Sequence, residues 1–178
     1  MKPHRICISL FISLLISTLS NAQSNYPKGD FISPVEFPML LSGTFAELRG
    51  NYFHSGIDIR TQGVEGKKIL ACADGYVSRI RISPFGFGKT VYITHPNGYS
   101  TVYAHLSGFN PEIDAWSKAE QYRLEQFDVD LFPQAGLIKV KQGEVIGYSG
   151  NSGSSQGPHL HFELIRSGTH LNPRGFLK

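Results

Sequence analysis

Short apolar segments broken by turn residues run through most of the chain and predict a mainly β fold. Val, Ile, Tyr and Thr are abundant in seven such segments, at residues 68–73, 76–82, 90–94, 100–105, 137–140, 145–148 and 160–165. Asp74-Gly75 and Pro96-Asn97-Gly98 interrupt the pattern, and the second is a strong hairpin signal. We therefore expect strands joined by tight turns.

One stretch departs from this pattern and predicts the only long helix. Asn110 is a favourable helix cap, Pro111 suits the first helical position, and Glu112 places an acid in the first turn. A partial apolar stripe follows at Ile113, Trp116, Ala119 and Leu124. We expect the helix to continue to about residue 127, inside a helical insertion near residues 110–136.

The first 22 residues have the three-part pattern of an export signal. Lys2 and Arg5 give a basic start, residues 6–19 form an apolar run, and Ser20-Asn21-Ala22 offers small residues for cleavage. A membrane anchor is the alternative, but 14 apolar residues are short for a span. We expect a cleaved signal peptide and a mature protein without a membrane span, in the periplasm or cell envelope or outside the cell.

The residues after the signal are expected to form one domain with an extended lead-in. Residues 23–42 contain Pro27, Pro34 and Pro38 with little periodicity, which predicts an extended segment without chemistry. Residues 43–178 are enough to bury a proper core.

The signal carries two of the 17 basic residues and none of the 14 acidic ones, so the mature net charge is +1. No cluster of Lys and Arg with interleaved aromatic residues is present, and no nucleic-acid partner is implied.

Three residues with reactive side chains are expected to take no part in chemistry. Cys72 is the only cysteine left after signal removal, and its apolar neighbours predict a buried small hydrophobic residue without a disulfide. His95 lies beside the predicted hairpin tip and His170 in a turn-like stretch. We interpret both histidines as solvated residues outside any site.

The pair His159 and His161 is the strongest chemical signal in the chain. Side chains alternate faces along a strand, so both rings should project from one face, about 7 Å apart. Together they can hold a divalent metal, or one can bind metal while the other moves protons. A polar strand face without chemistry is the alternative interpretation.

Three further residues extend this pair to a group of five. His54 and Asp58 are four apart with Gly56 between them, which predicts a turn entering a strand, and His105 ends another predicted strand. A catalytic zinc takes three protein ligands and leaves a position for water. Two of the five groups would then remain for acid, base or electrostatic work, and the spacing alone does not say which two.

Three separated motifs give the chain a resemblance to the lysostaphin/LytM-type zinc endopeptidases, which cleave peptidoglycan. They are His54-Ser55-Gly56-Ile57-Asp58, Tyr103-Ala104-His105-Leu106, and Ser149-Gly150-Asn151-Ser152-Gly153 leading to Gly157-Pro158-His159-Leu160-His161-Phe162-Glu163. The resemblance implies that His54, Asp58 and His161 bind Zn²⁺. It also implies that His105 and His159 flank the metal as catalytic residues without being permanent ligands.

The same resemblance implies a fold, a substrate class and a departure from the family pattern. The expected fold is an antiparallel, folded-over sheet of the barrel-sandwich type, and the expected substrates are peptidoglycan peptide stems or bridges. The insertion near 110–136 is longer and more helical than the loop typical of simple members. It either forms a wall of the cleft or only packs on the sheet.

Two other functions share these residue types. Two histidines and a carboxylate also form the facial triad of non-haem iron oxygenases, although His105 and His159 have no task there. The second alternative is a non-catalytic wall-binding or hydrolase-activating domain of the same fold, although all five positions of the site are present. The sequence leaves open whether glycine bridges or direct cross-links through D-amino acids are cleaved.

Overall fold

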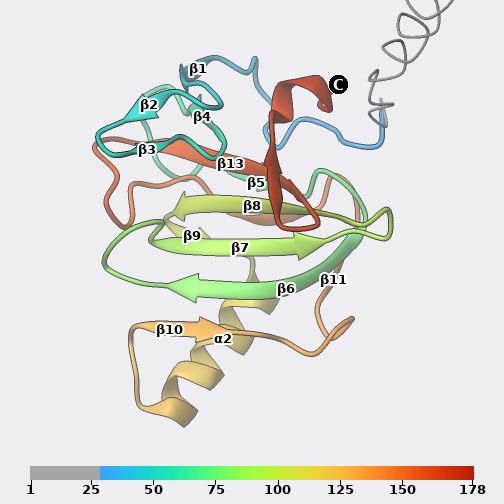
Figure 1. Cartoon of the computed structure of the whole chain (residues 1–178). Coiled ribbons are helices and arrows are strands. Elements are labelled where there is room, and N and C mark those ends of the chain that lie inside the picture. Colours follow the sequence, from blue (N-terminus) through green and yellow to red (C-terminus); the bar gives the residue numbers. More distant parts are fainter. Residues whose placement is uncertain (1–28) are drawn as a thin grey trace, which may run out of the picture.

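The computed structural model describes residues 29–178, and the chain there is mainly antiparallel β with one α-helix, as predicted (Figure 1). The expected signal peptide and the first residues of the lead-in lie outside the described part. No helix among residues 29–178 has both the length and the apolar character needed to cross a membrane.

A nine-stranded antiparallel sheet carries most of the structure. Its order is β1 (Leu41–Gly43), β4 (Ile57–Arg60), β13 (His159–Arg166), β8 (Tyr99–Leu106), β7 (Lys89–Thr94), β6 (Gly75–Ile82) and β10 (Val129–Leu131), while β11 (Lys139–Val140) pairs with β6 and β14 (Thr169–Leu171) with β13. Strands β4, β13 and β8 are therefore neighbours, although their residues are far apart in sequence. This arrangement brings the three predicted motifs together.

Two smaller sheets complete the fold. One contains β5 (Lys68–Leu70), β12 (Val145–Tyr148) and β9 (Gly108–Phe109), and the other contains β2 (Leu48–Arg49) and β3 (Tyr52–Phe53). A short 3-10 helix, η1 (Pro173–Gly175), follows β14. Buried apolar side chains of the main sheet and of the sheet around β12 form one continuous core, including Ile57, Ile69, Ile93, Ile146 and Phe162.

The predicted strand at 68–73 is wrong in its second half. Strand β5 ends at Leu70. The Ala71 N–H donates to Glu144 O, and Ala71 O accepts from the Gly143 N–H, so both groups bond to a turn and not to a strand ladder. An apolar run that is buried by a turn has the same composition as a buried strand, which explains the error.

The helix α2 (Pro111–Leu124) begins as predicted and ends earlier. Asn110 Oδ1 accepts from the Ile113 N–H at 2.9 Å. The helix stops before residue 127 because Glu125 adopts a left-handed conformation, with a φ of 53°. Figure 1 shows α2 and β10 together at the end of the main sheet opposite β1. The insertion therefore contributes an edge strand, β10, which pairs with β6, as well as the helix.

The interpretation of His95 as a solvated residue is wrong. Its side chain is buried, with Nδ1 2.8 Å from Asp74 O and Nε2 2.8 Å from Thr101 Oγ1. Its ring also makes an edge contact with Phe31 of the lead-in, at a centroid distance of 5.5 Å. Turn residues beside a histidine favour exposure, but here the side chain turns back under the lead-in.

A chain of polar groups continues inward from His95. The Thr101 hydroxyl hydrogen-bonds to the Tyr103 hydroxyl at 3.0 Å, and the Tyr103 oxygen accepts from the Cys72 N–H at 2.9 Å. The prediction that Cys72 is buried is confirmed, and burial raises the pKa of its thiol to about 12. His170 is exposed, as predicted, but it is not isolated, because its Nδ1 lies 3.4 Å from Glu163 Oε2.

Removing the Tyr103 hydroxyl should destabilise the fold. Tyr103→Phe leaves the buried Cys72 N–H without its acceptor, which typically costs about 1–3 kcal/mol. Chemical unfolding of the two proteins measures the difference. Tyr122→Phe, at a residue that is 83% exposed, is the control and should change stability by less than about 0.5 kcal/mol. An equal effect of the two variants would contradict the role of the buried hydroxyl.

Protonation of His95 should make folding stability depend on pH. Burial lowers the pKa of His95 in the folded protein, so the unfolded chain binds the proton more readily. The contribution of His95 is complete above the unfolded pKa of about 6.5 and is lost as the pH falls below it. In chelator-treated protein, the difference in unfolding free energy between wild type and His95→Gln should therefore shrink from pH 8 to pH 5. A difference that stays constant or grows would contradict this.

Candidate metal centre

The centre is built on the pairing of β4 with β13. Asp58 lies opposite His161 in this antiparallel pair, and the neighbouring Ile57 and Leu160 point to the other face, where they are fully buried in the core. His159 Nε2 and His161 Nδ1 lie 3.6 Å and 3.0 Å from the same oxygen, Asp58 Oδ1. The two histidines therefore share one face, as the alternation of a strand predicts.

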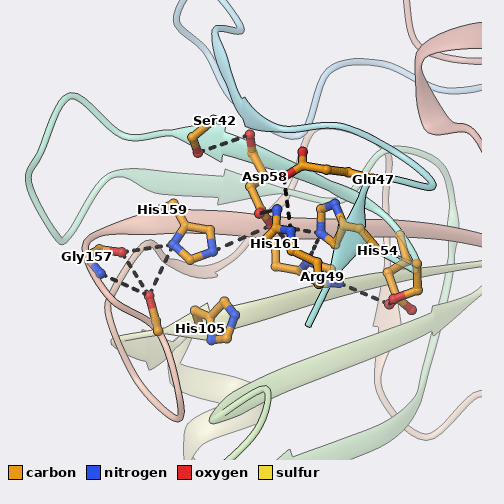
Figure 2. A network of polar contacts seen from close by, with 12 residues as sticks. Ser42, Glu47, Arg49, His54, Asp58, His105, Gly157, His159 and His161 are labelled. Atoms are coloured by element: carbon orange, nitrogen blue, oxygen red, sulfur yellow. Dashed lines mark hydrogen bonds and ion pairs between the residues drawn. The ribbon is translucent and has the colours of Figure 1, made fainter. Parts of the chain in front are cut away.

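Three buried atoms meet at one point of this face. His54 Nε2, Asp58 Oδ1 and His161 Nδ1 form a nearly equilateral triangle with sides of 3.0, 3.0 and 3.1 Å (Figure 2). His54 comes from the turn between β3 and β4, Asp58 from β4 and His161 from β13. The turn before β4 thus brings His54 and Asp58 together, as expected from their spacing around Gly56.

The outer nitrogen of each histidine fixes which inner atom is free to bind a metal. His54 Nδ1 lies 2.8 Å from Thr44 O, and a carbonyl only accepts, so this nitrogen carries the proton. His161 Nε2 lies 3.0 Å from Glu163 Oε1 and donates to that carboxylate. Burial opposes ionisation of Glu163, but hydrogen bonds from His161 and Ser55 hold its pKa below the usual range. Burial would lower the pKa of His161, but Asp58 and Glu163 outweigh this effect and raise it, so in the metal-free protein a proton competes with a metal for the inner atoms. Binding of a metal would displace this proton and leave both inner nitrogens as ligands.

Asp58 adds the third lone pair and a negative charge. Its Oδ2 accepts from Arg49 at 2.7 Å, which leaves Oδ1 for the triangle. Burial alone would raise the pKa of Asp58, but His161, His54 and Arg49 outweigh this effect and hold the pKa well below its usual range. Gly43 lies against this pair, where a Cβ would overlap both the guanidinium and the carboxylate.

The three inner atoms lie about 3 Å from one another, so they can share a proton through hydrogen bonds or bind one metal ion together, and they repel when neither is present. Two imidazole nitrogens and one carboxylate oxygen are the ligands that a catalytic zinc commonly has, with a position left for water. The donor set of His54, Asp58 and His161 therefore fits a divalent metal of this kind. Metals that require six or more oxygen ligands fit it poorly.

His105 and His159 flank the triangle, and a hydrogen bond at Nδ1 holds each ring. Each donates its Nδ1 proton to a backbone carbonyl, Ser152 O at 2.9 Å and Gly157 O at 2.8 Å. Both Nε2 atoms are then lone pairs, and the two ring centroids are 4.7 Å apart (Figure 2). Burial lowers the pKa of His105 to about 4, with the Ser152 carbonyl opposing the shift. His105 is therefore neutral at neutral pH and able to accept a proton.

The backbone of His105 departs from strand geometry, and this places its ring in the cleft. Along β8, Tyr103 points into the core, so strict alternation would bury His105 there as well. Instead His105 has a φ of 59°, within a bulge in which residues 103–106 oppose only 89–91. Such bulges redirect side chains and are frequent next to active sites.

The five predicted residues line one cleft of about 860 Å³. The remaining walls come from the segments around β1 to β4, from Gly86 and Phe87, and from residues 154–158. Residues 110–136 do not line it, so the insertion packs on the sheet and does not form a wall. This is the second of the two interpretations considered for the insertion.

Sequence reasoning missed the residues that hold the three inner atoms in place. Glu163 had a detectable signal, since it follows His161 by two positions and therefore shares its face. Arg49 and Thr44 had none, because they lie near Asp58 and His54 only through the hairpin of β2 and β3 and the loop before it.

The fold and the donor set together define a mainly β protein with a candidate centre for a divalent metal. The chain belongs to peptidase family M23, whose profile matches residues 52–121 and 136–173. This confirms the resemblance found in the sequence. The matched ranges contain all five site residues and leave out residues 122–135, about half of the insertion.

Individual relatives agree with this membership. The chain is 37% identical over 120 residues to the DD-carboxypeptidase/endopeptidase Mpg of Neisseria meningitidis, covering 67% of this chain and 22% of Mpg. It is 28% identical over 160 residues to the glycyl-glycine endopeptidase ALE-1 of Staphylococcus capitis, covering 87% of this chain and 34% of ALE-1. The chain thus spans between a fifth and a third of these two proteins.

A solved structure gives the same result for the fold. The catalytic domain of the prophage-encoded M23 protein EnpA from Enterococcus faecalis, solved as a point mutant, superposes with a TM-score of 0.59 at 28% identity. The match covers 82% of this chain and 97% of that domain. The mainly β fold expected from the sequence is therefore that of a solved M23 catalytic domain.

Glu163 should control the metal affinity of the centre although it contributes no atom to the triangle. Glu163→Gln keeps the size of the side chain but removes the charge that makes His161 a stronger ligand, and such changes typically weaken binding about 10- to 100-fold. Competition with a zinc-binding dye measures the dissociation constant. Glu112→Gln in the first turn of α2 is the control. Equal zinc affinity of the Glu163→Gln and wild-type proteins would contradict the assignment.

Proposed function

We propose that this protein is a zinc endopeptidase that hydrolyses peptide cross-links of bacterial peptidoglycan. The observation that supports this most is the convergence of three lone pairs beside two more histidines that present Nε2 to the same cleft. Relatives named as a peptidoglycan DD-endopeptidase and a glycyl-glycine endopeptidase support the substrate class.

In this proposal the chain holds the metal through His54 Nε2, Asp58 Oδ1 and His161 Nδ1. Zinc, when bound, supplies the Lewis acidity that polarises a peptide carbonyl and acidifies water. Asp58 brings one negative charge to a site from which water is largely excluded, which favours a dication over the protonated, empty site.

His105 and His159 carry the proton transfers. Both rings are fixed by their Nδ1 bonds, so neither must reorient to present Nε2 to a substrate in the cleft. A neutral imidazole can accept the proton released as water attacks the scissile carbonyl, and can then return it to the leaving amine. The ring that is not acting as the base can donate to the developing negative charge once it is protonated.

We further propose that the protein acts outside the cytoplasm, in the periplasm or cell envelope or beyond it. The basic, apolar and small residues of the first 22 positions support export. Peptidoglycan peptide stems or bridges would be the partners met there.

Replacing the histidines one at a time should separate binding from catalysis. His161→Ala removes one of three protein ligands, so zinc and activity should both be lost. His159→Ala and His105→Ala should keep one zinc per chain and lose about 10²- to 10⁴-fold in kcat, because proton transfer is made in the transition state. Metal analysis and turnover on purified sacculi with either cross-link type provide the two measurements.

Tyr122→Ala, at an exposed residue of α2 that does not line the cleft, provides the control and should keep both zinc and turnover. His170 is unsuitable, because its Nδ1 lies 3.4 Å from Glu163 Oε2. Loss of zinc from His159→Ala would overturn the division of roles. Zinc-loaded wild type without turnover on any sacculus would favour the non-catalytic alternative, and oxygen-dependent turnover with iron would favour the oxygenase.

A further inference from the structure

Arg60 lies on the same face of β4 as Asp58, one cross-strand residue pair further along β4 and β13. On β4 it follows Asp58 by two residues, and on β13 His159 precedes His161 by two. The register pairs His161 with Asp58 and His159 with Arg60, so all four side chains leave the same face in two adjacent cross-strand pairs. Arg60 therefore begins about 7 Å along the strand from Asp58.

The guanidinium of Arg60 has no partner within the described residues, although it lines the cleft. Arg60 is exposed and lines the cleft, and its contacts are made by the backbone, through the pairing with His159 and the N–H that donates to Leu40 O at 2.8 Å. The other arginine of the cleft, Arg49, differs, because its Nε lies 3.2 Å from Glu47 Oε1 and its Nη2 2.7 Å from Asp58 Oδ2. The cleft thus contains two guanidinium groups. Glu47 and Asp58 neutralise that of Arg49, whereas no acid neutralises that of Arg60 within the described residues.

We propose that Arg60 binds a substrate carboxylate attached to the carbon that carries the scissile nitrogen. This inference rests on the proposed function and selects between its two substrate types. In a direct cross-link through the D-centre of a diamino acid, the carbon bonded to the scissile nitrogen also carries a free carboxylate. In a glycine bridge the same position continues into a neutral peptide group. Arg60 therefore selects direct cross-links with a free carboxylate.

The geometry of the cleft suits this assignment. The carboxylate carbon is two bonds from the scissile nitrogen, so a substrate amide lying by the metal triangle and His159 directs its carboxylate to the adjacent pair of residues. Guanidinium and carboxylate groups form bidentate, charge-assisted hydrogen bonds, which are stronger than neutral ones. If Arg60 contacted only solvent and no substrate group, replacing the substrate carboxylate by a carboxamide would not change the rate of cleavage through this residue.

Two synthetic cross-linked peptides test this proposal. They share a D-alanyl scissile amide and differ only at the adjacent group, which is a carboxylate in one and a carboxamide in the other. Zinc-loaded wild type should cleave the carboxylate peptide with a kcat/KM about 10- to 100-fold higher, the range of a hydrogen-bonded charged pair. Arg60→Gln should reduce this ratio to near one while it retains one zinc per chain. Arg174→Gln, at an exposed arginine away from the cleft, should keep the wild-type ratio.

Binding of the same peptides to metal-free protein separates this inference from the proposed function. Calorimetry should show tighter binding of the carboxylate peptide to wild type, and Arg60→Gln should abolish the difference. If the peptides are not cleaved but this difference in binding is present, the carboxylate site stands and the endopeptidase function fails. If wild type cleaves both peptides at equal rates, the Arg60 assignment is wrong and the function stands. Discrimination that persists in Arg60→Gln also overturns the assignment.

Discussion

The site depends on three ligand atoms, two imidazole nitrogens and one carboxylate oxygen, that the fold holds within about 3 Å of one another, where they repel unless they share a proton or a metal ion. Each atom is directed inward because the other polar atom of its side chain is bonded outward, to Thr44 O, Glu163 Oε1 or Arg49. Removing any of these outer partners would let a ring or a carboxylate turn away. A shared proton relieves this repulsion in part, whereas a metal dication would relieve it for all three atoms at once, so the arrangement favours metal binding.

The strand register supplies the rigidity that this arrangement needs. Sites on paired strands are held more tightly than sites on loops, and here β4 lies hydrogen-bonded between β1 and β13. The same register that places Asp58 opposite His161 places Arg60 opposite His159. The pairing of β4 with β13 would thus position both the metal centre and the proposed carboxylate site.

Much of this site could be predicted from alternation and motif spacing, because a strand places every second residue on one face. That rule found His159 with His161, but it would place His105 in the core, and only the bulge and the left-handed φ of 59° bring its ring into the cleft. His95 was wrongly interpreted as solvated because its partner Asp74 lies 21 residues away in sequence. Arg49 was missed because its partner Asp58 lies on another strand. Local patterns do not contain such contacts, whereas the motif resemblance supplied the three residues proposed as metal ligands.

The tautomers of the histidines are the most direct test of this account. Long-range nitrogen–proton correlation spectra of the zinc-loaded protein, labelled with ¹⁵N at histidine, identify which ring nitrogen carries the proton. We expect a proton on Nε2 of His161 and on Nδ1 of His54, His105 and His159. A proton on Nδ1 of His161 would remove one of the three converging lone pairs and contradict the account.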